Sequence, residues 1–185
     1  MIANLYKNRV FFLLILLMIT TGCSVWENFT TYFNLYYNAD ELFQKSKKQI
    51  LEQKRDIFSI EPTTIPPAAN ADLQKVIEKC SNILQFSPNS SYVEDALMML
   101  GKSFYYQKNY LKAQRKFEEL ISTQPNSDYV LEAQLWTGKC NMRLRQYSAG
   151  LTILEDVRNK AIEDGEDEFM REAFIEEIVY FKSQR

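Results

Sequence analysis

The residues best suited to chemistry in this chain are cysteines, because its 185 residues include no histidine. Cys80 and Cys140 lack the spacing of a metal or redox motif. At an offset of 37 residues Cys80 aligns with Phe117, so both cysteines are expected to be small core residues. A disulfide between them is the alternative in an oxidising compartment.

Acid–base chemistry would have to come from tyrosine, lysine and glutamate, and these residues do not concentrate in one place. The chain also has no glycine-rich phosphate loop and no paired carboxylates facing a recognisable pocket. The acidic stretch 163–168 is not a complete calcium loop. We therefore predict no catalytic residue, no metal, no cofactor and no small-molecule substrate, and expect that the chain is not an enzyme.

The third cysteine, Cys23, follows a short apolar segment at the amino terminus. Lys7 and Arg9 precede ten apolar residues, Val10–Ile19, and a membrane-spanning helix requires about 20. Small residues then lead into the cysteine. This order resembles a bacterial lipoprotein signal peptide, which implies cleavage before Cys23 and lipidation of its side chain. An ordinary secretory signal with a chance cysteine is the alternative.

The resemblance also implies a location. Several acyl chains on one residue hold a protein stably at a membrane surface. Ser24, rather than Asp, follows Cys23, and this resembles the sorting code for the outer membrane. We therefore expect an outer-membrane, lipid-anchored protein on the periplasmic face, with residues 1–22 removed as the signal peptide.

The net charge argues against nucleic acid as a partner. The whole chain has 22 basic and 24 acidic residues, a net charge of −2. Removal of residues 1–22 takes away Lys7 and Arg9 and no acidic residue, which leaves −4. Nucleic-acid-binding domains carry a basic patch and a high pI.

The central part of the chain repeats itself at an offset of 37 residues. Pro88–Ala96 returns as Pro125–Ala133, and Gly101-Lys102 returns as Gly138-Lys139. A period of this length indicates helical hairpins that stack because none can cover its own apolar face. The order Leu97, Leu100, Gly101, Phe104, then Ala113, Phe117 and Pro125 resembles the tetratricopeptide repeat (TPR). We therefore predict an all-α fold, a TPR-like right-handed solenoid of helical hairpins over residues 71–185.

The apolar positions divide each unit into two helices. In the first helix Leu97, Leu100 and Phe104 lie on one face, and in the second Ala113 and Phe117 begin the matching stripe. The glycine between the stripes is expected to allow close helix approach.

The unit is three residues longer than the usual 34, and the extra residues lie in the Pro-Asn-Ser junction. At these junctions Ser91 with Glu94 has the spacing of a capping box, and Asp128 can cap the following helix. This longer junction resembles envelope lipoproteins of Gram-negative bacteria, including the accessory lipoprotein of the outer-membrane barrel-assembly complex.

An aromatic-rich segment and a proline-rich linker precede the repeats. Residues 23–54 are expected to form one or two helices behind the lipid anchor. The string Thr30–Phe43 resembles the segment after the anchor in repeat lipoproteins of the Bacteroidota, some of which serve gliding motility or type IX secretion. Its aromatic side chains could instead cover the open end of the first repeat. Residues 55–70 contain three prolines and predict a linker, after which a helix is expected from Asp72 to Phe86.

The last unit and the carboxyl-terminal helix follow the pattern less closely. Asn141, Gly150 and Leu154 replace the aromatic, alanine and phenylalanine of the preceding unit. Residues 169–185 predict one further amphipathic helix, with Phe174, Ile178 and Phe181 on one face. This helix would cap the stack, or the sequence stops partway through a longer array.

Partner binding is predicted on the first helix of each unit, off the packing stripe. Methionine, tyrosine and leucine with spaced cations suit an extended or helical peptide that carries apolar anchors and carboxylates. The alternative is that these side chains only pack against neighbouring helices. We expect simultaneous loss of both lysines to weaken partner capture without changing thermal stability. The predicted partner-binding residues are Met98, Lys102, Tyr105, Leu135, Lys139 and Met142.

Together these features predict a non-enzymatic, lipid-anchored TPR scaffold in a bacterial outer-membrane assembly. The expected partners are envelope proteins or peptides, and the membrane through the lipid anchor. Outer-membrane protein assembly is the principal expectation. A component of gliding motility or type IX secretion, and a periplasmic coordinator of envelope constriction, are the alternatives.

Overall fold

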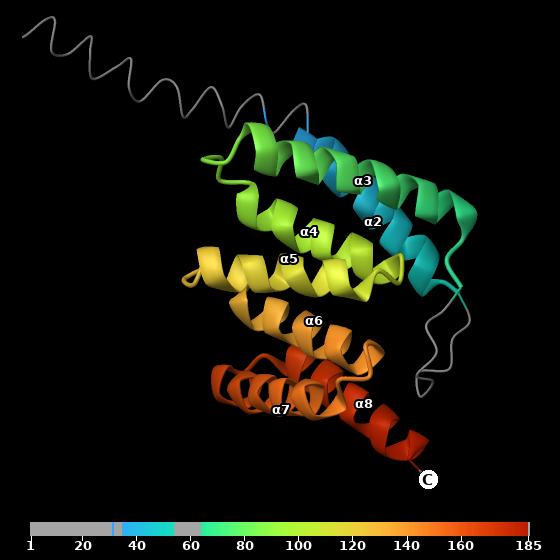
Figure 1. Cartoon of the computed structure of the whole chain (residues 1–185), viewed down its shortest axis with the longest axis vertical. Helices are drawn as coiled ribbons and strands as arrows, with labels where there is room; N and C mark the ends of the chain where they lie inside the picture. Colours follow the sequence, from blue (N-terminus) through green and yellow to red (C-terminus); the bar gives the residue numbers. More distant parts are fainter. Residues whose placement is uncertain (1–30, 32–34, 54–63, 185) are drawn as a thin grey trace, which may run out of the picture.

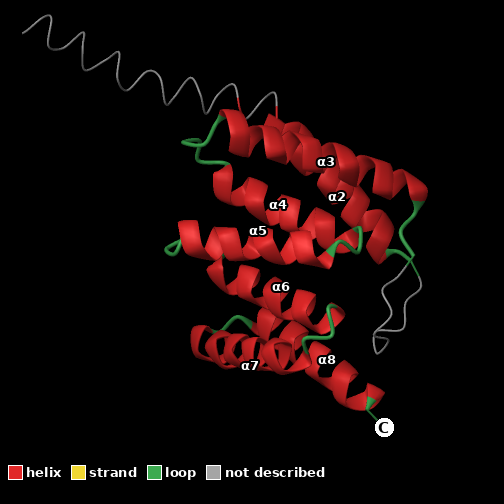
Figure 2. Ribbon diagram, viewed as in Figure 1, coloured by secondary structure: helices red, strands yellow, loops and turns green. Residues whose placement is uncertain are grey.

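The computed structural model describes Thr31, residues 35–53 and residues 64–184. All regular structure in these ranges is helical (Figures 1 and 2). Each helix packs against the next one along the chain. The helices are α2 (Tyr37–Leu51), α3 (Pro67–Phe86), α4 (Val93–Tyr106), α5 (Tyr110–Thr123), α6 (Val130–Arg143), α7 (Tyr147–Asp164) and α8 (Asp167–Ser183).

The helices form three hairpins, α2–α3, α4–α5 and α6–α7, stacked in chain order with α8 at the end (Figure 1). The buried core follows this order, with one apolar cluster in each successive group of three helices. A core divided in this way is typical of repeat proteins, in which each unit contacts only its neighbours. The predicted all-α, TPR-like helical-hairpin solenoid is therefore confirmed.

The α4–α5 hairpin has the predicted apolar stripes. Leu97 and Leu100 are almost fully buried on α4, and Ala113, Phe117 and Leu120 are fully buried on α5. Spacings of three and four residues place each set on one helix face. The fold therefore follows directly from the periodicity of the apolar residues.

Glycine allows the two helices of a unit to approach closely. A Cβ atom at Gly101 would lie 2.5 Å from Cε1 of Phe117. In the next unit, a Cβ at Gly138 would lie 2.9 Å from the side chain of Leu154. The smaller Leu154 replaces the phenylalanine in this weaker unit, and the crossing is still tight.

The helix caps predicted at the junctions are not formed as expected. The N-cap residues of α4 and α6 are Tyr92 and Tyr129, and neither makes a side-chain capping bond. Instead, Ser90 Oγ accepts a hydrogen bond from the Tyr92 amide at 3.3 Å, and Ser127 Oγ accepts one from Tyr129 at 3.1 Å. The serine turn precedes each helix, so the predicted capping box from Ser91 to Glu94 and the predicted cap at Asp128 are wrong.

The first hairpin is joined across α2 and α3 by polar contacts. Lys45 Nζ lies 2.7 Å from Asp72 Oδ2. Before α2, Thr31 Oγ1 donates a hydrogen bond to Ser87 Oγ at 2.8 Å.

Helix α3 begins at Pro67 rather than at Asp72, because proline at the first helical position has no amide hydrogen bond to lose.

The predicted signal peptide, Cys23 and the centre of the predicted linker lie outside the described residues. Helix α2 falls within the segment 23–54 that was expected to be helical. No described helix is long and apolar enough to cross a membrane.

The apolar face predicted on the carboxyl-terminal helix is not the face that packs against the solenoid. Phe174 and Phe181 of α8 are 48% and 59% exposed. The residues that α8 buries are Ala173, Glu177 and Val179, because this side of the helix faces α6 and α7. The predicted apolar stripe therefore lies on the outer side of α8.

Candidate functional site

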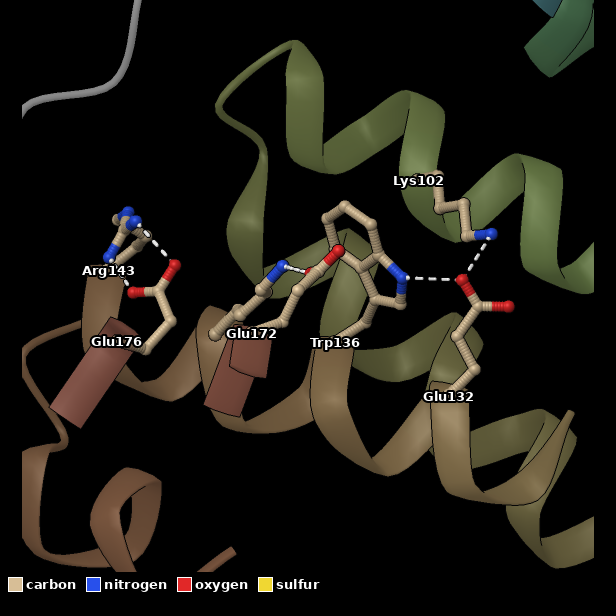
Figure 3. A network of polar contacts seen from close by, with 7 residues as sticks. Lys102, Glu132, Trp136, Arg143, Glu172 and Glu176 are labelled. Carbon is tan, nitrogen blue, oxygen red and sulfur yellow. Dashed lines mark hydrogen bonds and ion pairs between the residues drawn. The ribbon is translucent and has the colours of Figure 1, made fainter. Parts of the chain in front are cut away.

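The first helices of successive units are connected by a row of charged side chains around one tryptophan (Figure 3). The repeat positions these residues, because the 37-residue offset places equivalent lysines on α4 and α6. A glutamate faces each basic residue: the lysine of α4 pairs with a glutamate of α6, and the two basic residues of α6 pair with glutamates of α8. We call this row the A-helix ladder. Its members are Lys102, Glu132, Trp136, Lys139, Arg143, Glu172 and Glu176.

The first step of the ladder joins α4 to α6. Lys102 Nζ lies 2.7 Å from Glu132 Oε1, and the side chains are only 14% and 20% exposed. The indole N–H of Trp136 donates to the same carboxylate oxygen at 3.2 Å. One glutamate therefore satisfies a cation and a buried indole together, in partly dehydrated surroundings that strengthen the attraction.

The second step joins α6 to α8 through Lys139 and Glu172. The ammonium of Lys139 also lies 4.4 Å from the centroid of the Trp136 ring, and that of Lys102 lies 5.8 Å away. Both distances are within the range of a cation–π contact. The indole therefore connects the first two steps of the ladder.

The third step is a two-pronged ion pair between Arg143 and Glu176. The two guanidinium nitrogens donate to separate carboxylate oxygens at 2.9 and 3.1 Å. Both side chains are largely buried, at 13% and 12% exposed. This planar geometry is the strongest common form of a side-chain ion pair and fixes α8 against α6.

The structure brings the six predicted partner-binding residues to the first helices but does not leave them all accessible. Met98, Leu135 and Met142 are 2%, 1% and 4% exposed. Their side chains lie in the apolar interior, as in the packing alternative for this face. Lys102 and Lys139 are partly exposed and already paired with glutamates. Because these pairs are partly buried, we now expect the loss of both lysines to lower stability as well.

Tyr105 is half-buried and packs edge-on against Trp136, with ring centroids 5.0 Å apart. Burial raises the pKa of its phenol well above the ordinary value, so the hydroxyl stays neutral at physiological pH. The phenol of Tyr105 therefore supports the ladder by packing rather than by charge. Asp95, on the same helix, accepts a hydrogen bond from the hydroxyl of Tyr129 at 2.7 Å. Partner binding by the six residues stays a prediction.

The glutamates of α8 were missed in the sequence, although a signal for them was present. Glu132-Ala133 returns as Glu172-Ala173, at an offset of 40 rather than 37 residues. Helices α6 and α8 begin 37 residues apart, at Val130 and Asp167, so the equivalent glutamate lies three residues further into α8 than into α6. A search restricted to a constant offset does not find the second glutamate.

Neither a cluster of metal ligands nor an exposed thiol is found among the described residues. No three of their histidine, cysteine, aspartate or glutamate side chains come together as metal ligands. Cys80 and Cys140 are buried free thiols, so the alternative of a disulfide between them is wrong. Burial raises the pKa of each thiol to about 12. A thiol in this state is a poor nucleophile at neutral pH.

Residues 95–127 match the family model of the tetratricopeptide repeat. This range covers nearly all of α4, the whole of α5 and the junction that follows. A search of curated proteins found no match to the chain. TPR units generally bind protein partners, and stacked units present an extended surface for them. The chain therefore contains a tetratricopeptide repeat within a longer TPR-like solenoid, an architecture typical of protein–protein interaction scaffolds.

Proposed function

We propose that the chain is a non-enzymatic, lipid-anchored scaffold for protein–protein interactions in the assembly of bacterial outer-membrane proteins. The observation that carries the scaffold role is the A-helix ladder. Its ion pairs cross from α4 to α6 and from α6 to α8, and so fix three first helices side by side. A surface that is already ordered loses little entropy when a partner binds.

The ladder also suggests which partner chemistry fits. Its three cations are only 12–14% exposed, and Glu172 is the most exposed of its side chains in ion pairs, at 38%. A partner therefore meets carboxylate oxygens first, beside the aromatic edges of Tyr105 and Trp136. We infer an envelope protein or peptide that supplies a cation to the ladder together with an apolar anchor.

The proposed place in the cell rests on the amino-terminal sequence. Lipidation at Cys23 would hold the solenoid at the outer membrane, on the periplasmic face, and confine it close to its partners. The long Pro-Asn-Ser junctions support outer-membrane protein assembly through their resemblance to envelope lipoproteins of that system.

A second candidate is a role in gliding motility or type IX secretion. The observation that favours it is the aromatic string Thr30–Phe43, which resembles the segment behind the anchor in such lipoproteins. Coordination of envelope constriction is the third alternative. All of these roles use the same scaffold physics, so the identity of the captured partner decides among them.

The test is cross-linking in the native host, followed by purification through a carboxyl-terminal tag and mass spectrometry. Barrel-assembly subunits in the wild-type sample and their loss with Cys23→Ser support the proposal. Secretion or gliding subunits would select the second candidate instead. Recovery of no specific protein, or turnover in a screen with cell-wall and peptide substrates, would refute the proposed role.

A charge-swapped ladder tests the binding surface separately from the fold. The double variant Lys139→Glu/Glu172→Lys keeps one cation and one anion in the second step and reverses their order. We expect it to fold and to lose the partner, because the carboxylate no longer stands where the partner's cation binds. Capture at wild-type levels would remove the ladder from the proposed binding surface.

A further inference from the structure

The outer face of α8 carries a run of exposed apolar side chains. Phe174, Ile175 and Phe181 are 48%, 38% and 59% exposed, and Ile178 between them is partly exposed. Residues 174, 178 and 181 share one face of a helix, since they are separated by four and then three positions. Figure 1 shows α8 at the end of the stack, with its carboxyl-terminal half extending past α7.

The equivalent face is covered in the α4–α5 unit. The match of Glu132-Ala133 to Glu172-Ala173 aligns α8 with α6 and, through the 37-residue repeat, with α4. Phe174 then corresponds to Gln134 of α6, which is polar and partly exposed, and to Leu97 of α4, which is 1% exposed beneath the second helix of its unit. Among the described residues, no second helix follows α8 to cover this face.

The composition of this face shows what kind of helix it fits. At the position of Gly101 and Gly138, α8 has Ile178. At those glycines, a large side chain of the second helix lies within 3 Å of the point where a Cβ atom would be. A branched side chain at the crossing excludes that arrangement, and it suits two helices held about 8–10 Å apart by interlocking side chains.

The charges at the two ends of α8 are complementary to those of the same helix in reverse. Asp167 and Glu168 lie in its first turn, and Lys182 lies in its last. Asp167 and Lys182 are equally far from the midpoint between Phe174 and Ile175. In an antiparallel pair centred there, each acidic end faces a basic end and the two apolar runs lie against each other.

We infer that the outer face of α8 binds the α8 face of a second copy of this chain, forming a twofold-symmetric dimer. Such an interface is self-complementary: where a residue of one copy contacts a second residue of the other copy, the reverse contact is also made. It removes the exposed phenylalanines from water without a glycine crossing. The inference is independent of the proposed role in outer-membrane protein assembly.

The first experiment measures the mass of the full chain in a nonionic detergent by light scattering over a dilution series. We expect a dimer that dissociates on dilution, and a dissociation constant raised by at least about tenfold in Phe174→Glu. The matched control is Phe86→Glu, since Phe86 of α3 is 67% exposed and lies away from α8. Unchanged circular dichroism in both variants shows that the fold is intact. A monomer at every concentration, or a dimer unaffected by Phe174→Glu, would overturn the inference.

Cysteine cross-linking in native membranes tests the antiparallel register. Ile175→Cys lies beside the symmetry axis and is expected to form a disulfide with its own copy under mild oxidation. Phe181→Cys is the control, because it faces residue 168 of the other copy. It would lie about 20 Å along the axis from its own mate, beyond disulfide reach. Equal dimer yields from the two variants, or cross-links to a different protein only, would contradict this pairing.

Discussion

The first step of the A-helix ladder can be measured by a double-mutant cycle on Lys102 and Glu132. Lys102→Met keeps most of the aliphatic length and removes the charge. Glu132→Gln keeps an oxygen that can accept from Trp136 and removes the negative charge. Each single variant therefore leaves one partly buried charge without its partner, whereas the double variant removes both charges together.

The magnitude follows from burial. The two side chains are 14% and 20% exposed, and Nζ and Oε1 are 2.7 Å apart. Exposed pairs contribute about 0.2–1 kcal/mol, and breaking a fully buried pair costs about 3–5 kcal/mol. We expect each single variant to lose about 1.5–2 kcal/mol of unfolding free energy, with a coupling energy of about 1 kcal/mol. For a chain of this size that loss lowers the melting temperature by about 3–8 °C.

Urea and thermal unfolding, followed by circular dichroism and by the fluorescence of Trp136, measure the cycle. Lys160 and Asp164 provide a matched control, since Nζ and Oδ1 are 2.8 Å apart but the side chains are 56% and 41% exposed. Lys160→Met should leave the unfolding midpoint unchanged because solvent screens this pair. Equal effects at the two sites, or additive single variants in the cycle, would refute the argument from burial.

Four further predictions concern the helix crossing, two aspartates and the buried thiols. Gly101→Ala should destabilise the protein by about 1–3 kcal/mol because its Cβ would overlap the ring of Phe117, and adding Phe117→Leu should recover much of the loss by copying the leucine crossing at Gly138. A hydrogen bond from the neighbouring lysine lowers the pKa of Asp72 below 3.8, so Asp72→Asn should reduce stability at pH 7, and the difference should vanish as the pH falls below 3.8. Burial raises the pKa of Asp95, so ionisation is unfavourable in the fold; Asp95→Asn should raise stability at pH 7, and unfolding curves against pH should show this gain disappear in acid. Both buried cysteines should resist a thiol reagent at pH 8 and react on unfolding, and rapid labelling of the native protein would contradict their burial.

The part of the fold that sequence could predict is the part determined by local periodicity. Apolar spacing and one glycine identified both helices of the α4–α5 unit and their crossing, because each signal lies within a few residues of the structure that it specifies. The residues at which the helices start were harder to predict. Ser90 and Ser127 compete with nearby polar residues for the same capping role, and backbone geometry decides between them.

The candidate site depended on contacts between units, which are harder to predict. Lys102 and Lys139 were identified from their repetition, but their carboxylate partners lie 30 and 33 residues further along the chain. The apolar stripe of α8 was predicted, but not its outward direction, because a single helix does not reveal which side its neighbours occupy. The side that packs is fixed instead by Ala173 and by the ion pairs of α8 to α6 and α7.

In the proposed role, partner binding and solenoid stability would depend on the same side chains of the ladder. A partner cation that reaches Glu172 must either join the existing pair with Lys139 or displace the lysine towards the ring of Trp136, 4.4 Å away. Displacement retains the cation–π contact, so the lysine loses one attraction and keeps another. Binding at this step would therefore change the contact between α6 and α8 without exposing an unpaired buried charge. Arg143 has no such alternative, because two of its guanidinium nitrogens donate to Glu176. The pair of Arg143 with Glu176 should therefore hold α6 and α8 together while the pair of Lys139 with Glu172 rearranges on binding.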